Sequence, residues 1–327
     1  MEPLHFCTYE DRRKNWVGLK ILILSFGEHM EAHHFHLVLP EVPAELNRWL
    51  AYHAPWVHVH RFAPEAEGWA VKAEVLLFLL EDVKLPSVTW LDADQMIIRE
   101  FSELFVGHSS DKLCISQCFC NKRGDEASFA SIWGDSPERD FPVLLNTSIL
   151  KVSDYHTKVL KVWRDRCVSD KFTNVQGKPV KLRDYALSSD QQILQGLLMS
   201  GRFSGDNGID VFIIEKGKHL VHDHHYYTIT SGERLRLGLR LWNPYFVHCA
   251  ASKPWFLPDS KLVPYIQLKP YVVLAARYRD RLEEDVAYWM DYRTPFGQLC
   301  KAATLNNPHL QGLGLWFRDR VQRLLNR

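Results

Sequence analysis

The sequence predicts an α/β protein built on a largely parallel sheet, and three observations support this. Its 327 residues contain 46% hydrophobic and 24% charged side chains, which is enough to bury a full core and excludes general disorder. Segments with strand-like and helix-like hydrophobic patterns alternate through the first third of the chain. The longest purely aliphatic and aromatic run, residues 75–80, is too short to span a bilayer. Strand–helix alternation in such a chain favours right-handed crossovers between parallel strands.

The predicted elements of the first part follow one another in order. Apolar residues recur at i, i+3, i+4 and i+7 from Leu19 to Phe26, which indicates one face of an amphipathic helix. Pro40 ends a strand, and Pro43 begins a helix because a first-turn N–H has no intrahelical partner. We expect strands at residues 4–8, 35–39, 56–62 and 88–91, and helices around residues 19–26, 43–50 and 68–81.

The pattern is less regular after Ile98. Ser153 is placed to N-cap a helix that runs to Cys167, and Ser188 and Ser189 each precede a glutamine by three residues, as in a capping box. Four histidines between residues 219 and 225 indicate a polar edge strand that can border an acceptor pocket. We expect strands at residues 113–119, 143–152, 211–215 and 245–249, loops at 121–139 and 171–181, and helices over 189–198 and 270–327.

Charge and cysteine content limit the class of protein. Forty Lys and Arg residues against 39 Asp and Glu leave a formal net charge of +1, which argues against a nucleic-acid binder. Seven scattered cysteines form no disulfide framework, and the first residues lack the basic and apolar regions of a secretory signal. We therefore expect a cytoplasmic protein. Residues 313–327 form a basic amphipathic segment, which either docks on the domain or lies on an anionic membrane surface.

The most informative stretch is an apolar strand that ends in two acids, Asp92 and Asp94. Ligands of open α/β sheets bind at the carboxyl ends of strands, so these acids stand where a ligand would be. Residues i and i+2 of a strand share a face, and two carboxylates on one face can hold Mn²⁺ or Mg²⁺. A pair of solvated acids in a strand-end turn is the alternative. Taken alone, the pair does not decide between them.

Further motifs accompany this pair in a fixed order along residues 6–255. They are Phe6-Cys7-Thr8-Tyr9, Lys72, Leu91-Asp92-Ala93-Asp94, Leu145-Asn146-Thr147-Ser148-Ile149-Leu150, Ser189-Asp190-Gln191, Val247-His248 and Lys253-Pro254-Trp255. In this order they resemble the motifs of GT-A glycosyltransferases of family 8, the group that includes glycogenin and bacterial lipopolysaccharide galactosyltransferases. The block after His248 differs from the family because it is one residue shorter before Lys253 and lacks a glycine.

The resemblance implies a metal site and a binding site for a sugar nucleotide. Asp92, Asp94 and His248 would hold Mn²⁺ or Mg²⁺, since Mn²⁺ accepts mixed nitrogen and oxygen ligands. Lys253 would supply a positive charge to the leaving diphosphate. The remaining donor-binding residues implied by the family are Thr8, Tyr9, Lys72, Asp92 and Asn146.

The same resemblance implies catalytic roles for Asp190 and Gln191, beneath the anomeric carbon of the donor sugar. It implies a GT-A domain over residues 1–255 with a mixed central sheet, followed by a helical extension over residues 256–327. The implied activity is metal-dependent transfer of a hexose, glucose or galactose first, from a UDP-sugar to an acceptor hydroxyl with retention of configuration. The acceptor would be a carbohydrate, a lipid-linked molecule or a protein.

Two other classes of protein compete with this interpretation. A haloacid-dehalogenase-like phosphohydrolase also places an Asp-x-Asp after an apolar strand, and residues 205–210 resemble its second acidic motif. Its first motif should lie near the start of the domain, whereas Asp92 follows three predicted strands. A non-catalytic nucleotide-sugar-binding protein would keep the fold without turnover. Retention of Asp94, Asp190 and Lys253 argues against it.

Overall fold

The computed structural model of the chain describes residues 2–105, 107–204, 208–223, 243–250, 253–256 and 270–283, and single residues at 236, 239, 241, 298, 299 and 302. The chain divides into two compact units, each assembled from separate segments. The first unit comprises Met1–Asp11, Ala32–Asp92 and Phe101–Glu215, and the second comprises Arg12–Glu31, Ala93–Glu100 and Lys216–Arg327.

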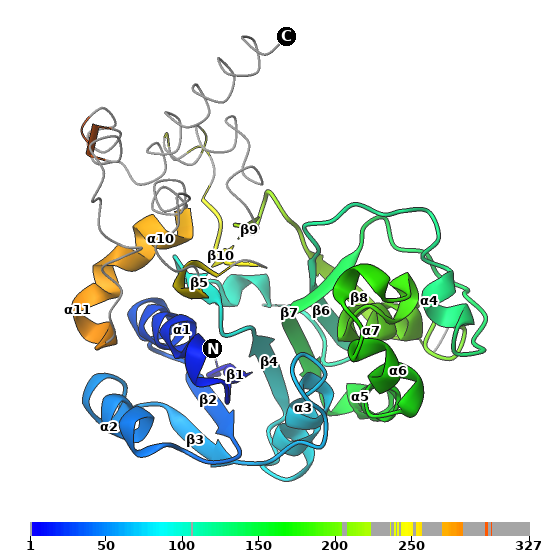
Figure 1. Ribbon diagram of the computed structural model, residues 1–327, viewed down its shortest axis with the longest axis horizontal. Coiled ribbons are helices and arrows are strands. Elements are labelled where there is room, and N and C mark those ends of the chain that lie inside the picture. The colour runs from blue at the N-terminus through cyan, green and yellow to red at the C-terminus, as the bar shows by residue number, and fades with distance from the viewer. Residues whose placement is uncertain are drawn as a thin grey trace. The chain divides into compact units, whose positions relative to one another are not determined.

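The first unit is built on a seven-stranded sheet with the strand order β3-β2-β1-β4-β7-β6-β8 (Figure 1). Strands β3, β2, β1 and β4 run parallel to one another, and β6 runs parallel to β8. Strand β7 is antiparallel to both of its neighbours, β4 and β6. The strands are β1 (His5–Tyr9), β2 (His34–Leu39), β3 (His58–Arg61), β4 (Ser87–Leu91), β6 (Lys112–Gln117), β7 (Leu145–Ser153) and β8 (Asp210–Ile214).

The α/β class and the mixed central sheet are confirmed, and so is the expectation of a largely parallel sheet, because β7 alone runs against the direction that the other six strands share. The reason lies in the connection before β7. A parallel neighbour needs a crossover, usually through a full helix, but residues 118–144 contain only the single-turn helix α4 (Ser128–Ser131). The chain therefore returns antiparallel.

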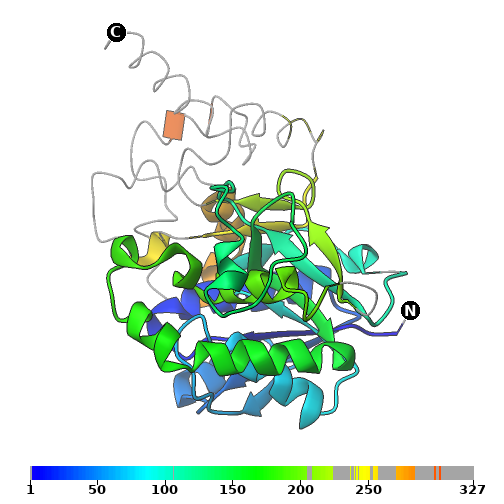
Figure 2. The ribbon, with the colours of Figure 1, turned by 90° about the vertical axis from the view of Figure 1, so that its right-hand side faces the viewer.

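Three helices of the first unit pack side by side on one face of its sheet, as Figures 1 and 2 show. They are α3 (Lys72–Glu81), α5 (Thr157–Cys167) and α7 (Asp190–Met199). Their buried residues form one core with the apolar side chains of the sheet, including Leu76, Trp163 and Ile193. On the opposite face Phe6 meets Phe101 edge to face at 5.2 Å. The first unit also contains α2 (Ala44–His53) and α6 (Asp170–Gln176).

Helix α6 occupies a segment that the sequence analysis assigned to a loop. Its side chain Phe172 is 3% exposed and belongs to the same core, which explains why a polar segment with Gly177 and Pro179 nevertheless forms a helical turn. Tertiary burial here overrides a weak local preference.

The predicted helix starts are confirmed in position but not in all of their hydrogen bonds. Ser153 and His156 form a capping box, which opens a 3₁₀ turn ahead of α5. Ser189 is the N-cap of α7, but its hydroxyl donates to Oε1 of Gln192 at 2.5 Å and accepts no backbone N–H of the helix.

In its described residues, the second unit combines a three-stranded sheet, in the order β5-β10-β9, with the helices α1, α10 and α11. β10 is antiparallel to β5 and parallel to β9. The short strand β5 is not among the strands that the sequence predicts. The elements are α1 (Trp16–His29), β5 (Gln95–Ile97), β9 (Leu220–His222), β10 (Phe246–His248), α10 (Pro270–Ala275) and α11 (Arg279–Leu282).

Helix α1 is buried on nearly all sides from Trp16 to Phe26. Its Lys20 is 1% exposed and donates from Nζ to the carbonyl of Leu282 at 2.8 Å, which ties the end of α11 to α1.

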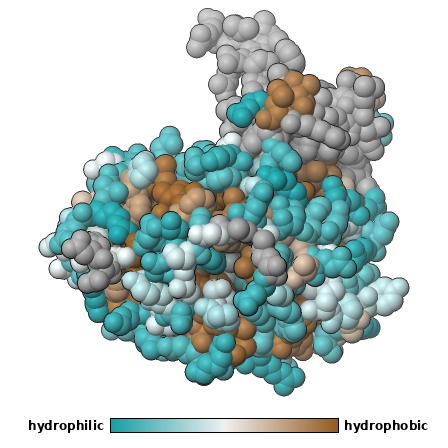
Figure 3. All heavy atoms as spheres, turned by 180° about the vertical axis from the view of Figure 1, so that it is seen from behind, coloured by the Kyte–Doolittle hydropathy of each residue, from teal (hydrophilic) through white to brown (hydrophobic). Residues whose placement is uncertain are grey.

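Figure 3 shows hydrophilic side chains over most of the described surface on one face, with hydrophobic side chains gathered in smaller patches. None of the described helices is long and apolar enough to cross a membrane. Most of residues 256–327, including the segment 313–327, lie outside the described residues, so the division at residue 255 stays a prediction.

Candidate active site

Lys72 lies at the centre of a buried polar cluster in the first unit. It is the first residue of α3, and its ammonium lies 3.0 Å from Oδ1 of Asp92 and 3.7 Å from Oδ2 of Asp190. Thr147 of β7 joins the two ends of the cluster, because its hydroxyl accepts from Lys72 at 2.8 Å and donates to Asp190 at 2.9 Å. Trp90 donates from Nε1 to Oδ1 of Asp92 at 2.7 Å. Side chains from α3, β4, β7 and α7 therefore hold the Asp92 carboxylate and the Lys72 ammonium in fixed positions.

Burial and charge act against each other in this cluster. Burial alone would lower the pKa of Lys72, but Asp190 and Asp92 outweigh it, so that the pKa of the ammonium is raised and the lysine stays charged. Burial raises the pKa of Asp190, and Lys72 and Thr147 oppose that rise. Lys72 and Asp190 are 4% and 3% exposed, so each depends on the other as a buried counter-charge.

A second pair of polar side chains lies next to this cluster. Asn146 precedes Thr147 on β7, and its Nδ2 donates to Oε1 of Gln191 at 2.8 Å. Its Oδ1 accepts the backbone N–H of Ser148 at 2.9 Å, which fixes the orientation of the amide. Asn146 and Gln191 therefore contact each other, while Asp190 forms part of the Lys72 cluster.

Thr8 and Tyr9 end strand β1, which runs parallel to β4 with Cys7 opposite Trp90. Their strand therefore ends at the same edge of the sheet as the strand before Asp92. Thr8 is fully buried and its hydroxyl has no hydrogen-bond partner among the described residues, whereas the Tyr9 hydroxyl donates to Asp11 at 3.1 Å.

In the second unit, Asp94 is contacted by two residues that lie more than 150 positions later in the sequence. Nε2 of His248 lies 3.3 Å from Oδ1 of Asp94, and the Lys253 ammonium forms an ion pair with Oδ2. Lys253 also donates to the carbonyl of Cys249 at 2.5 Å. The shortened spacing between His248 and Lys253 therefore still brings both side chains to the same carboxylate.

Backbone and side-chain contacts fix the orientation of His248. Strand β10 pairs antiparallel with β5, which places His248 opposite Gln95, and Cys249 donates its N–H to the carbonyl of Asp94 at 3.0 Å. Nδ1 of His248 lies 3.1 Å from Nδ1 of His222, its register partner on β9. Since Nδ1 is engaged there, Nε2 is the nitrogen that faces Asp94.

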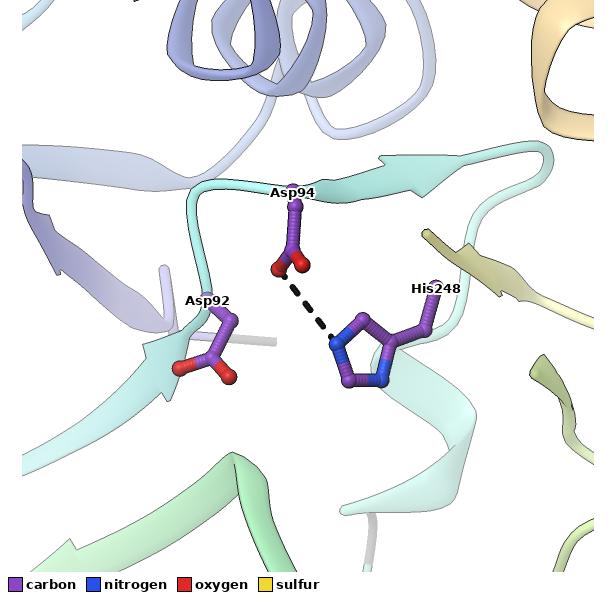
Figure 4. A group of neighbouring side chains, drawn as sticks. All are labelled: Asp92, Asp94 and His248. Atoms are coloured by element: carbon purple, nitrogen blue, oxygen red, sulfur yellow. Dashed lines mark ion pairs between the residues drawn. The ribbon is translucent and has the colours of Figure 1, made fainter. Parts of the chain in front are cut away.

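Asp92, the residue that follows β4, precedes Asp94 by two positions, so the chain itself keeps the two carboxylates close. Figure 4 shows the side chains of Asp92, Asp94 and His248, and each offers a ligand atom within 4.8 Å of the others. Two carboxylate oxygens and one imidazole nitrogen suit Mn²⁺ or Mg²⁺, and Nε2 of His248 already faces the acids. The donor set therefore fits a divalent metal ion.

Three residues with roles in these clusters were not singled out from the sequence. Thr147 lies within the motif Leu145–Leu150 without a predicted role. Trp90 is part of the apolar strand before Asp92, and nothing in the sequence distinguishes it from its neighbours. His222 was assigned only to a polar edge strand, and it instead supports His248. His222 lies directly opposite His248 on the neighbouring strand, and this pairing is known only once the two strands are placed side by side.

Comparisons with known proteins found similar chains among solved structures. No family model matches the chain, and no curated protein matches it either. Among solved structures, the chain is similar to the apo structure of a bifunctional glycosyltransferase, WbbM, with 13% identity and a TM-score of 0.49. That match covers 78% of this chain and 47% of WbbM, so the chain spans about half the length of that protein. It is also similar to a glycosyltransferase involved in glycosylation of the major capsid of PBCV-1, with 9% identity and a TM-score of 0.41, over 77% of this chain and 94% of the other.

Proposed function

We propose that this protein is a metal-dependent glycosyltransferase that moves a hexose from a UDP-sugar to an acceptor hydroxyl. One observation carries the proposal. His248 and Lys253 contact the two oxygens of Asp94, although these three residues come from two motifs far apart in the sequence. The family resemblance depends on the order of these motifs along the chain. If the motifs form one site, their side chains must contact one another, as Asp94, His248 and Lys253 do.

Each side chain of these motifs has a task in this reaction. Asp92, Asp94 and His248 would hold a divalent ion, which would supply positive charge to the diphosphate as it leaves. Lys253 would exchange its ion pair with Asp94 for the same diphosphate. Lys72 holds the Asp92 carboxylate in place through its 3.0 Å ion pair. Asn146 and Gln191, whose amides already meet, would contact the donor sugar.

The bond changes follow from this arrangement. The acceptor oxygen forms the new bond to the anomeric carbon while the bond from that carbon to the diphosphate breaks. Positive charge develops on the sugar, and the side-chain oxygen of Gln191 would stabilise it. The diphosphate takes the acceptor proton on the face from which it left. This sequence retains the anomeric configuration, so that an α-linked donor gives an α-linked product.

The test is a panel of nucleotide-sugars, assayed for release of the nucleoside diphosphate with Mn²⁺ and with EDTA. We expect metal-dependent hydrolysis of UDP-glucose or UDP-galactose above the other donors. No release from any donor would overturn the proposed activity. Proton NMR of the first transfer product tests retention separately, because a β-linked product from an α-linked donor contradicts it.

The competing classes give different results in the same assay. A phosphohydrolase would cleave simple phosphate esters, and a binding protein would retain the donor without cleaving it. Residues 205–207 of the segment that resembles the second phosphohydrolase motif lie outside the described residues.

We further propose a cytoplasmic location, with residues 313–327 bringing the enzyme to an anionic membrane if its acceptor is lipid-linked. Flotation with anionic liposomes, with and without residues 313–327, tests this.

A further inference from the structure

Five histidines gather on one face of three neighbouring strands in the first unit. β1 contributes one of them, and β2 and β3 contribute two each at alternate positions. We call this group the histidine array, and its members are His5, His34, His36, His58 and His60. The parallel register places His5 opposite His34 and His36 opposite His58. Because alternate residues of a strand share a face, the imidazoles stack in one layer.

The imidazole nitrogens approach one another in pairs. Nδ1 of His34 lies 3.3 Å from Nε2 of His58. Nδ1 of His5 lies 3.0 Å from Nε2 of His36, and Nδ1 of His36 lies 2.9 Å from Nε2 of His60. Two imidazoles bound to one Zn²⁺ at the usual bond length hold their nitrogens about 3.4 Å apart at a tetrahedral angle. The His34–His58 pair therefore already has the separation that a bound ion needs.

The array is also suited to an ion by its charge. Neutral imidazole is the form that binds metal. Among the described residues, no carboxylate forms an ion pair with any of the five, and an ion that binds His34 and His58 would replace the hydrogen bond between their nitrogens.

Access differs across the array. His36 is 5% exposed, and His60 packs edge to face on Phe78 of α3 with ring centroids 6.1 Å apart. His58 lies on β3, the edge strand of the sheet, and is exposed, while His34 is half-buried. An ion can therefore reach the His34–His58 pair from solvent, and the more buried imidazoles support the pair from within the layer.

The array is separate from the candidate active site. His5, His34 and His58 are the first residues of their strands, whereas Asp92 follows the last residue of the parallel strand β4. The two sites therefore lie at opposite ends of the parallel strands.

We propose that the histidine array is a binding site for a first-row transition-metal ion of the Zn²⁺, Ni²⁺ and Cu²⁺ group. His34 Nδ1 and His58 Nε2 are its ligands, and water completes the coordination. These ions prefer imidazole ligands, whereas Mg²⁺ prefers oxygen. Among the described residues, Asp92, Asp94 and His248 form the one group with three ligand atoms within 4.8 Å, so the array provides a two-imidazole site of moderate affinity.

The experiment is a Zn²⁺ titration of metal-depleted full-length protein by calorimetry. It compares wild type, His58→Gln, the double variant His34→Gln/His58→Gln, and His53→Gln as a control on helix α2. We expect the double variant to bind one equivalent fewer than wild type, and His58→Gln to bind that equivalent at least tenfold more weakly. His53→Gln should behave as wild type.

Two further readouts keep the result independent of folding and of the proposed activity. Cu²⁺ electron paramagnetic resonance of wild type should show coupling to imidazole nitrogen that the double variant loses, while circular dichroism shows both folded. Mn²⁺-dependent donor hydrolysis should be equal in the two proteins. Equal Zn²⁺ stoichiometry and affinity in wild type and the folded double variant would overturn the metal site, whatever the outcome for glycosyl transfer.

Discussion

The ammonium of Lys72 lies 3.0 Å from a carboxylate oxygen of Asp92, the first acid of the Asp-x-Asp pair. Lys72 begins a helix and Asp92 follows a strand, and both are within the first unit. Since Lys72 also neutralises the buried Asp190, one side chain couples the position of Asp92 to the stability of the core.

Replacing Lys72 with Met should destabilise the fold strongly. Met keeps most of the volume but leaves Asp190, which is 3% exposed, without its counter-charge. Breaking a buried pair in this way costs about 3–5 kcal/mol. Urea unfolding measures the loss, and Lys161→Met is the control. The Lys161–Glu81 pair is 2.7 Å long but 48% and 41% exposed, so its loss should cost less than about 1 kcal/mol. Similar costs for the two variants would contradict a buried pair at Lys72.

Replacing Asp94 with Asn should abolish Mn²⁺-dependent turnover and leave the protein folded. The amide keeps the volume but removes the charge that faces His248 and Lys253. Nucleotide release from the best donor gives the rate, and thermal unfolding gives the stability. Asp82→Asn, at an exposed position after α3, should be fully active. Wild-type activity in EDTA, or in Asp94→Asn, would exclude the proposed metal site.

Replacing Gln191 with Ala should lower kcat far more than it raises KM. Its side-chain oxygen would stabilise charge that develops mainly in the transition state. Steady-state kinetics with the best donor separates the two parameters, and Asn47→Ala on the exposed face of α2 serves as the control. An increase in KM with unchanged kcat would instead assign Gln191 to ground-state binding.

Replacing Gly18 with Ala should disturb the segment that carries Asp94. A Cβ at Gly18 would lie 2.8 Å from Cζ2 of Trp255 and 2.9 Å from the carbonyl oxygen of Ala93, and the backbone atom cannot move without shifting Asp94. We expect a loss of about 1–3 kcal/mol in the free energy of unfolding and weaker Mn²⁺ binding. Gly177→Ala, where the nearest atom is 3.9 Å away, should change neither. Normal Mn²⁺ affinity in Gly18→Ala would show that the two positions are not coupled.

Acid should destabilise the protein partly through His156. Burial lowers the pKa of His156 to about 4, against 6.5 for the ordinary side chain, because its ring is fully buried, and this outweighs the opposing effect of the hydrogen bond to the carbonyl of Asp111. Between pH 6.5 and 4 the unfolded chain therefore binds the extra proton. The stability is complete above pH 6.5 and falls as the pH drops to 4, by about 3 kcal/mol from this group.

The comparison of wild type with His156→Gln isolates that contribution. Urea unfolding at several pH values should show the difference in stability between the two proteins shrinking as the pH falls from 6.5 to 4. A difference that stays constant over this range would mean that His156 is equally protonated in the folded and unfolded states.

The sequence by itself determined the α/β class, the position of most strands and the edge at which the acids lie. These follow from hydrophobic periodicity and from chain order, both of which are local properties. It also placed Asp94, His248 and Lys253 in one expected site, although that step depended on a family resemblance. Helix α6, strand β5 and the antiparallel direction of β7 were not predictable in this way, because burial of Phe172 and pairing with distant strands decide them.

Only the tertiary structure decided which polar groups neutralise one another. Thr147 bridges Lys72 and Asp190, and His222 holds the ring of His248, because strands and helices distant in sequence bring these atoms within hydrogen-bond distance. The histidine array arises in the same way from the register of three parallel strands. Periodicity tells which face of a strand a side chain occupies, but the partner it meets is fixed by the register between strands, which no local pattern encodes.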